Sequence, residues 1–246
     1  VKVIDRQSAP GMETSYGNAG QISPGYSTPW AAPGIPFKAM KWLFQRHSPL
    51  SIRPDGTLFQ LRWMAQMLAN CTSSRYALNK ERMLRLAQYS RNCMRELRAD
   101  TGIAYEARQQ GTLQVFRTRK QLDAIAKDTA VLDEAGVEYR VLAPEQFGEI
   151  EPGLSRSAGK LAGGLYLPGD ETGDCRLFTD RLAALAAQAG VRFVHDATID
   201  RIEREGASVS GVVVDGKRET ADAYVLALGS YSRKLALDLG LDLPVY

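Results

Sequence analysis

An acidic residue at the end of a short strand is the first feature of this sequence that could do chemistry. Residues 1–6 read VKVIDR, a β-branched run that stops at Asp5. Dinucleotide-binding folds place such an acid where its two oxygens accept hydrogen bonds from a ribose diol. Aspartate also ends strands simply because it favours turns, so Asp5 alone leaves both interpretations open. Arg6, next to it, either covers an adenine ring or faces water.

A loop of small and polar residues follows this strand. Residues 13–21 read ETSYGNAGQ. Ser15, Asn18 and Gln21 offer hydroxyl and amide groups, and Gly17 and Gly20 allow the backbone to approach a ligand closely. The composition suits an anion or a heteroaromatic ring, and it also suits an ordinary surface turn.

The position of Asp5 predicts that the sequence is a fragment. In a dinucleotide-binding fold, a strand and a G-x-G-x-x-G turn precede the ribose acid by roughly 20 residues. Here residue 1 is valine and the acid is residue 5. We therefore expect a longer chain whose phosphate-binding turn lies upstream.

Other chemistries find less support in the residues. Positions 170–175 read DETGDC, but their spacing does not match a calcium loop, and Asp174 is expected to cap the helix that follows. Cys175 as a nucleophile needs a histidine, and nothing places His47 or His195 nearby. Because no cysteine or histidine pairs occur at ligand spacing, no metal site is predicted.

Composition narrows the class of protein. The 246 residues are 44% hydrophobic and 24% charged, as in ordinary globular proteins. The net charge is only +3 and no lysine or arginine block stands out, so no nucleic-acid partner is expected. Three widely spaced cysteines indicate reduced thiols. No apolar run reaches the roughly 18 residues of a membrane span.

Hydrophobic periodicity predicts alternating helices and strands. Expected helices are 58–71, 79–100, 120–135, 144–150, 176–189 and 231–239. Expected strands are 1–6, 105–108, 112–116, 137–142, 161–167, 191–195, 198–204, 209–214 and 223–228. The last is nearly all apolar, as a central parallel strand should be. In helix 79–100, an apolar stripe that includes Met83 and Leu86 is expected inside, and five arginines are expected in solvent: Arg82, Arg85, Arg91, Arg95 and Arg98.

This order predicts a mixed α/β protein with two interleaved domains. Residues 1–24 and 173–246 carry the nucleotide-type elements. Residues 25–172 form a substrate domain. The long stretch 7–36, rich in glycine and proline, reads as a loop that wraps a ligand or makes several turns.

Several stretches together resemble the small subunit family of bacterial D-amino acid dehydrogenases. These are flavoenzymes of the D-amino acid oxidase and glycine/sarcosine oxidase superfamily. The resemblance covers essentially the whole chain and is carried by residues 3–6, 13–26, 52–67, 163–174, 199–214 and 223–230.

The resemblance implies an incomplete FAD-binding Rossmann-type domain interleaved with a mixed-sheet substrate domain. It implies non-covalent FAD and oxidation of D-amino acids to 2-oxo acids and ammonia. It further implies a respiratory electron acceptor and a peripheral position at the cytoplasmic side of the bacterial inner membrane. Because the family continues past Tyr246, where an arginine grips the substrate carboxylate, this chain alone is expected to hold FAD poorly.

The resemblance also assigns roles to individual residues. Asp5 would bind the adenosine ribose with Arg6 beside it, and Ser15 would lie near the pyrophosphate. Asn18, Gly20 and Gln21 would lie near the flavin ring. Ile199 would contact the adenine through its backbone, and Gly229 belongs to a small-residue turn near the cofactor. Leu228 stands where the family more often has threonine. No catalytic residue is assigned, because hydride transfer to a flavin requires no side-chain acid or base.

Two alternatives stay open at this point. A related flavin amine oxidase would act on glycine or sarcosine-type substrates and use oxygen directly. A non-catalytic fragment would have no activity.

Overall fold

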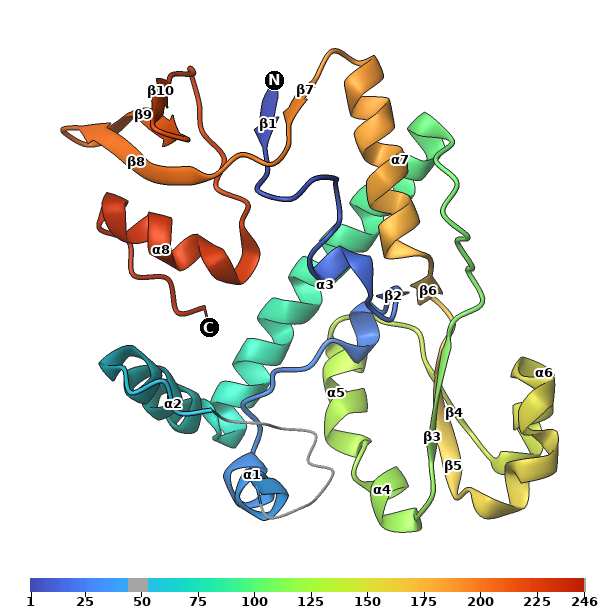
Figure 1. Cartoon of the computed structure of the whole chain (residues 1–246). Helices are drawn as coiled ribbons and strands as arrows, with labels where there is room; N and C mark the ends of the chain where they lie inside the picture. The colour runs from blue at the N-terminus through green and yellow to red at the C-terminus, as the bar shows by residue number, and fades with distance from the viewer. Residues whose placement is uncertain (44–52, 246) are drawn as a thin grey trace. The chain divides into compact units, whose positions relative to one another are not determined.

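The computed structural model describes residues 1–43 and 53–245, which divide into two compact units (Figure 1). Unit 1 comprises Val1–Asn18, Arg53–Gln66 and Thr179–Tyr246, and unit 2 comprises Ala19–Ile52 and Met67–Phe178. Helices and several small sheets alternate along the chain, so the predicted mixed α/β class is confirmed. The assignment of 1–24 and 173–246 to a cofactor domain, and of 25–172 to a substrate domain, stays a prediction.

Unit 1 is built on one parallel strand pair and one antiparallel sheet. β1 (Lys2–Ile4) runs parallel to β7 (Arg192–Val194), with Val3 opposite Phe193. The second sheet has the order β10–β9–β8. Its strands are β8 (Ile199–Glu205), β9 (Ser208–Val214) and β10 (Lys217–Glu219). An ion pair between Lys2 and Glu219 ties β1 to this sheet.

Short helices complete unit 1. They are η1 (Thr14–Tyr16), η5 (Gly229–Tyr231), α8 (Ser232–Ala236) and η6 (Leu237–Leu239). Two longer helices have residues in both units: α2 (Leu58–Asn70) and α7 (Cys175–Gln188). The predicted cap of α7 is confirmed, since Leu177 N donates to Asp174 Oδ1 at 2.8 Å.

Unit 2 combines helices with two small antiparallel sheets. One has the order β3–β5–β4, and the other pairs β2 with β6. The strands are β2 (Gln21–Ile22), β3 (Thr112–Phe116), β4 (Arg140–Leu142), β5 (Gly163–Leu167) and β6 (Glu171–Thr172). The α-helices are α1 (Ile35–Leu43), α3 (Ser73–Thr101), α4 (Arg119–Asp123), α5 (Ala126–Glu134) and α6 (Phe147–Ile150). The 3-10 helices are η2 (Pro24–Tyr26), η3 (Pro144–Gln146) and η4 (Pro152–Lys160).

The central strand β5 organises the core of unit 2. Every residue of its GGLYL sequence is buried, and side chains alternate between the two faces of the sheet. Leu165 and Leu167 therefore share one face and Tyr166 lies on the other. The resulting clusters are Phe116, Leu122, Ile125 with Leu165; Leu84, Leu132 with Leu167; and Leu142, Phe147 with Tyr166.

The orientation of α3 differs from the prediction. Met83 and Leu86, expected inside, are 40% and 68% exposed. Lys80 is instead buried and forms an ion pair with Asp128 at 2.5 Å. Arg82, Arg85 and Arg95 are exposed, as predicted, whereas Arg98 is partly buried. Arg95 and Arg98 both bind a buried carboxylate, because buried acids require cationic partners. The inward face of this helix therefore combines the buried Leu84 and Lys80 with the partly buried Arg98.

That carboxylate belongs to Glu171, whose residue is 1% exposed. Arg95 Nε donates to Oε1 at 2.5 Å, and Arg98 Nη1 donates to Oε2 at 2.8 Å. Burial raises the pKa of Glu171, but the hydrogen bonds and charges of Arg98 and Arg95 outweigh burial and hold the pKa below its usual range. These two ion pairs to Glu171 join α3 to β6.

The neighbouring acid, Asp170, shows the opposite shift. Its residue is 2% exposed and no hydrogen bond reaches its Oδ2. Burial raises the pKa of Asp170, and hydrogen bonds from Ser23 and Thr112 offset this effect only in part. The pKa is therefore raised for Asp170 and lowered for Glu171, although both carboxyls are buried.

Two predicted strands are wrong. Residues 223–228 form no strand, and Val225 is 90% exposed. Apolar composition gives a buried strand only where a neighbour pairs with its backbone, and no strand in the described part of the chain does so. In 105–108 a single bridge forms, from Arg108 to Thr172.

Gly20 has a packing role in unit 2. Gly173 N donates to Gly20 O at 2.9 Å, which holds the two backbones together. Gly20 has φ +61, and a Cβ at this position would lie 1.9 Å from Gly173 O. Any side chain would therefore separate these segments.

We expect Glu171→Gln to lower the free energy of unfolding at pH 7 by about 2–4 kcal/mol, because two guanidinium groups lose their buried partner. A glutamate whose pKa is lower in the folded protein than in the unfolded chain stabilises the fold at pH values above its unfolded pKa of about 4.3. This stabilisation is lost as pH falls through the folded-state pKa. The difference from the unchanged protein should therefore vanish in acid. Urea unfolding at several pH values measures it.

Asp170→Asn is the matched control. An aspartate whose pKa is higher in the folded protein than in the unfolded chain stabilises the fold at pH values below its unfolded pKa, and this stabilisation is lost as pH rises through the folded-state pKa. The ionised Asp170 therefore lowers the stability of the fold at pH 7. This variant should be as stable as the unchanged protein or more stable. Equal destabilisation by both substitutions would contradict the assignment.

Gly20→Ala should destabilise the fold by about 3 kcal/mol or more, because the clash with backbone adds to the strain of a positive φ. Gly17→Ala should have little effect, since φ is −149 and nothing lies within 4 Å of its Cβ position. Thermal unfolding followed by circular dichroism compares the two. Similar melting temperatures would show that the approach to Gly173 is looser than described.

Candidate functional site

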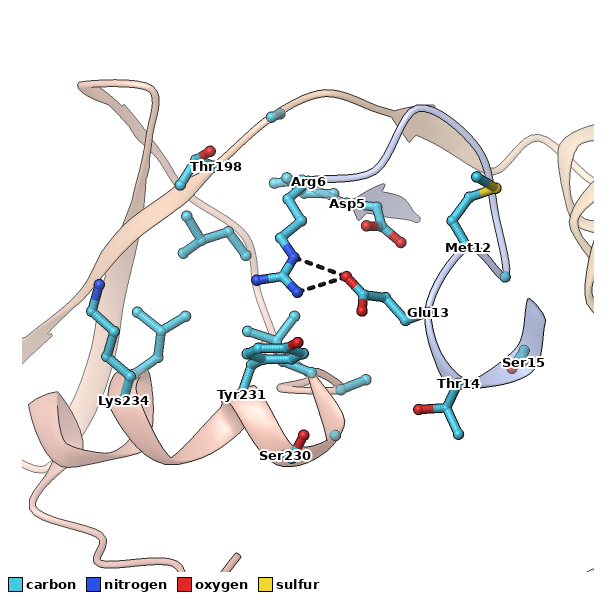
Figure 2. A pocket seen from close by; sticks show the side chains of 18 of the residues that line it. Asp5, Arg6, Met12, Glu13, Thr14, Ser15, Thr198, Ser230, Tyr231 and Lys234 are labelled. Atoms are coloured by element: carbon cyan, nitrogen blue, oxygen red, sulfur yellow. Dashed lines mark hydrogen bonds and ion pairs between the residues drawn. The ribbon is translucent and has the colours of Figure 1, made fainter. Parts of the chain in front are cut away.

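A cavity of about 600 Å³ opens in unit 1 (Figure 2). Four segments and part of α7 line it: residues 4–6, residues 11–15, residues 197–199, residues 227–235 in part, and Thr179. All of these belong to unit 1. A volume of this size is typical of small-molecule sites.

The parallel pairing of β1 and β7 brings the first polar groups together. Asp5 N donates to Val194 O at 2.9 Å, and Ala197 N donates to Asp5 O at 3.1 Å. These bonds hold Asp5 beside the segment that carries Thr198 into the pocket. Gln7 N donates to Asp5 Oδ1 at 2.9 Å, which orients the carboxylate. A carboxylate has about four acceptor sites, so capacity is left for ligand hydroxyls.

Arg6 contacts Glu13 and Tyr231 at the edge of the pocket. Its Nε and Nη2 donate to Glu13 Oε1 at 3.1 and 2.6 Å. Its guanidinium carbon lies 3.9 Å from the centre of the Tyr231 ring, and Figure 2 shows the guanidinium over that ring. Gln7 Nε2 donates to the same Glu13 oxygen at 2.5 Å. The hydrogen bonds from Arg6 and then Gln7 lower the pKa of Glu13, so it is ionised at neutral pH.

Two glycines shape the walls. Gly11 has φ +70, and a Cβ there would meet Thr179 at 3.3 Å. Gly229 has φ +54 with nothing within 4 Å of its Cβ position. Since Gly229 lines the cavity, a ligand can approach its backbone closely.

The structure brings together five of the eight residues predicted to bind a cofactor. Asp5, Arg6, Ser15, Ile199 and Gly229 line the cavity. The other three do not line it. Asn18 belongs to unit 1, and its Nδ2 donates to Thr14 O at 3.5 Å. Gly20 and Gln21 belong to unit 2, where Gln21 pairs with Thr172. Their predicted place near a flavin ring stays a prediction.

Sequence reasoning missed seven polar residues of the pocket: Glu13, Thr14, Thr179, Thr198, Ser230, Tyr231 and Lys234. Glu13 follows Arg6 by seven residues, and a search for opposite charges at the two ends of a short loop could have suggested the pair. Tyr231 and Lys234 reach the cavity only through the placement of η5 and α8, which no local pattern signals.

The chemistry of this lining is that of a binding site. It holds two carboxylates, from Asp5 and Glu13, and two cations, from Arg6 and Lys234. The described residues around the cavity include no histidine or cysteine. His195, just outside, stacks on Phe193 with ring centres 5.9 Å apart. The arrangement can hold a diol, an aromatic ring and an anion.

Within residues 1–43 and 53–245, no helix combines the length and the apolar composition that a membrane span requires. No three histidine, cysteine, aspartate or glutamate side chains gather there as metal ligands would.

Known structures share this fold. A glycine oxidase from Geobacillus kaustophilus superposes with a TM-score of 0.63 at 21% identity, covering 99% of this chain and 52% of that one. Iminodiacetate oxidase from Chelativorans sp. BNC1 gives 0.60 at 18% identity, covering 98% and 52%. An L-amino acid deaminase from Proteus vulgaris gives 0.60 at 17%, covering 98% and 44%. The chain therefore spans about half the length of these proteins.

The family is shown by the sequence itself. The model of the family described as "DAO: FAD dependent oxidoreductase" matches residues 1–246. FAD is the cofactor of that family, and the Rossmann-type part of the predicted fold agrees with the structural neighbours. This chain belongs to the DAO family of FAD-dependent oxidoreductases.

Proposed function

We propose that the chain is part of an FAD-dependent enzyme that oxidises D-amino acids to 2-oxo acids and ammonia. The family supports the oxidoreductase class and the cofactor. The preference for D-amino acids rests on the sequence resemblance to the D-amino acid dehydrogenase small subunit. The chain spans about half the length of its structural neighbours, so we propose this activity for the whole enzyme of which the chain is part.

One observation carries the cofactor assignment. The carboxylate of Asp5 stands at the end of a parallel strand pair and faces a cavity of about 600 Å³. Ligands of open α/β folds bind outside the carboxyl ends of parallel strands. An acid at that point is suited to the ribose of a dinucleotide.

The other residues of the pocket fit an adenosine group. Ser15 and Ser230 offer hydroxyls, Gly229 offers backbone at close range, and the cations Arg6 and Lys234 can face the pyrophosphate or the base. When bound, FAD supplies the two-electron oxidation of the amine. The residues of this chain hold and orient the cofactor, and none of them is proposed as a catalytic acid or base.

The electron acceptor is part of the same proposal. We infer a respiratory acceptor and a peripheral position at the cytoplasmic side of the inner membrane, both from the resemblance. The D-amino acid substrate and this acceptor are then the partners of the enzyme.

A second candidate is an amine oxidase that uses oxygen directly. It is favoured by the likeness to a glycine oxidase over 99% of this chain. At 21% identity that likeness extends to the fold only. The choice of electron acceptor distinguishes the two.

Asp5→Ala should raise the Kd for FAD by about tenfold to a hundredfold, since hydrogen bonds to a charged acceptor are lost. Quenching of flavin fluorescence on titration measures this. Asp222→Asn is the control, because this exposed acid does not line the cavity. If the full-length enzyme that contains this chain quenches no flavin fluorescence, the cofactor proposal is wrong and a non-catalytic role is favoured.

With FAD supplied, the full-length enzyme that contains this chain should reduce an artificial dye faster with D-alanine than with L-alanine or glycine. It should consume little oxygen in the absence of dye. Dye bleaching and an oxygen electrode record both rates. Rapid oxygen uptake with glycine would instead support the second candidate.

A further inference from the structure

Helix α1 and the turns before it present large apolar side chains to solvent. Trp30 is 79% exposed, Phe37 is 77% exposed and Met40 is 57% exposed. Phe37 and Met40 are three positions apart in α1, so they lie on the same side of the helix. Large apolar groups gathered at an exposed surface are typical of an interaction site.

Backbone hydrogen bonds hold Trp30 close to the start of α1. Ala32 N donates to Trp30 O at 3.0 Å, and Ile35 N donates to Ala32 O at 3.1 Å. Lys38 N donates to Gly34 O at 3.1 Å, which continues the same run of turns into the helix. The whole segment belongs to unit 2. Trp30 is therefore joined to the apolar side of α1 by a short, ordered connection.

The charges that this segment contributes are all positive. Lys38 and Lys41 are exposed, and Lys41 lies one helical turn after Phe37. The sequence has no aspartate or glutamate between Glu13 and Asp55. Long lysine stems can lie along apolar groups while the ammonium reaches outward. The surface of Trp30, Phe37, Met40, Lys38 and Lys41, called here the α1 face, therefore complements an anionic surface.

An anionic lipid bilayer fits the α1 face better than a protein partner does. Tryptophan is enriched at the level of the lipid headgroups, and interfacial helices combine tryptophan and phenylalanine with lysine. Anionic lipids attract each lysine that lies near the membrane surface. The buried centre of a protein interface is instead depleted in lysine.

We propose that the α1 face binds the surface of a membrane that contains anionic lipids. Trp30, Phe37 and Met40 enter the headgroup region, and Lys38 and Lys41 bind lipid phosphates. This inference rests on the proposed function, because it supplies the surface for the peripheral position inferred for the enzyme. Binding here would hold the enzyme at the bilayer that contains its respiratory acceptor.

Co-sedimentation of the full-length enzyme that contains this chain with lipid vesicles tests the proposal. Vesicles of phosphatidylcholine alone are compared with an equal mixture of phosphatidylcholine and phosphatidylglycerol, which the enzyme should prefer. Trp30→Ser combined with Phe37→Ser should weaken binding to the mixed vesicles by about tenfold or more, because two aromatic groups no longer leave water. Lys38→Gln combined with Lys41→Gln should weaken it by about tenfold and abolish the preference for the mixture.

Matched controls come from other exposed positions of unit 2. Leu86→Ser removes an exposed apolar side chain of α3. Lys120→Gln combined with Lys127→Gln removes two exposed lysines from α4 and α5. Both controls should bind the vesicles as the unchanged enzyme does. Equal weakening by the controls and by the α1 variants would overturn the α1 face as the binding surface.

The remaining outcomes separate this proposal from the proposed function. Vesicle binding that survives both α1 variants overturns the α1 face and leaves the peripheral position in place. An α1 variant with a changed oligomeric state or a much lower melting temperature would show that protein covers this face, which also overturns the proposal. Reduction of a dye with D-alanine is measured in parallel. An active enzyme that binds no vesicles overturns the α1 face alone, and an inactive enzyme that binds through it overturns the catalytic proposal alone. The lysine variant keeps the test decisive should the aromatic variant not fold.

Discussion

The candidate site depends on the parallel pairing of β1 with β7. Only three residue pairs form this ladder, from Lys2 with Arg192 to Ile4 with Val194. The hydrogen bonds that continue past it hold Asp5 against Val194 and Ala197. They bring residues from the start of the chain beside residues almost 200 positions later. The positions of Asp5, Arg6 and Thr198 in the cavity all follow from that contact.

Unit 2 depends on a different constraint, the burial of charge. Glu171 is fully enclosed and clamped by Arg95 and Arg98. Together with the buried Leu84, these ion pairs orient α3, and Leu86 is left in solvent. Buried ion pairs of this kind contribute little net stability but are costly to break. They are therefore better understood as fixing the arrangement of α3 and β6.

Local sequence patterns predicted the features that depend on nearby residues, such as helix periodicity and helix capping. The helix 58–71, the cap at Asp174 and the buried strand 161–167 follow from periodicity and turn chemistry, and the structure has each of them within a few residues. The pocket positions of Asp5 and Ser15 also agreed. Glu13 and Tyr231 were missed because their roles arise only when η5 meets the loop after β1. The strand 223–228 was wrong because pairing is a tertiary property that apolar composition does not contain.

The central claim is that the end of β1 binds the adenosine of FAD. A crystal structure of the protein with FAD tests it most directly. The account predicts ribose hydroxyls within hydrogen-bonding distance of the Asp5 carboxylate, with the adenosine inside the cavity that Asp5 lines. Adenosine bound elsewhere, with Asp5 facing solvent and the cavity filled by other groups, would contradict it.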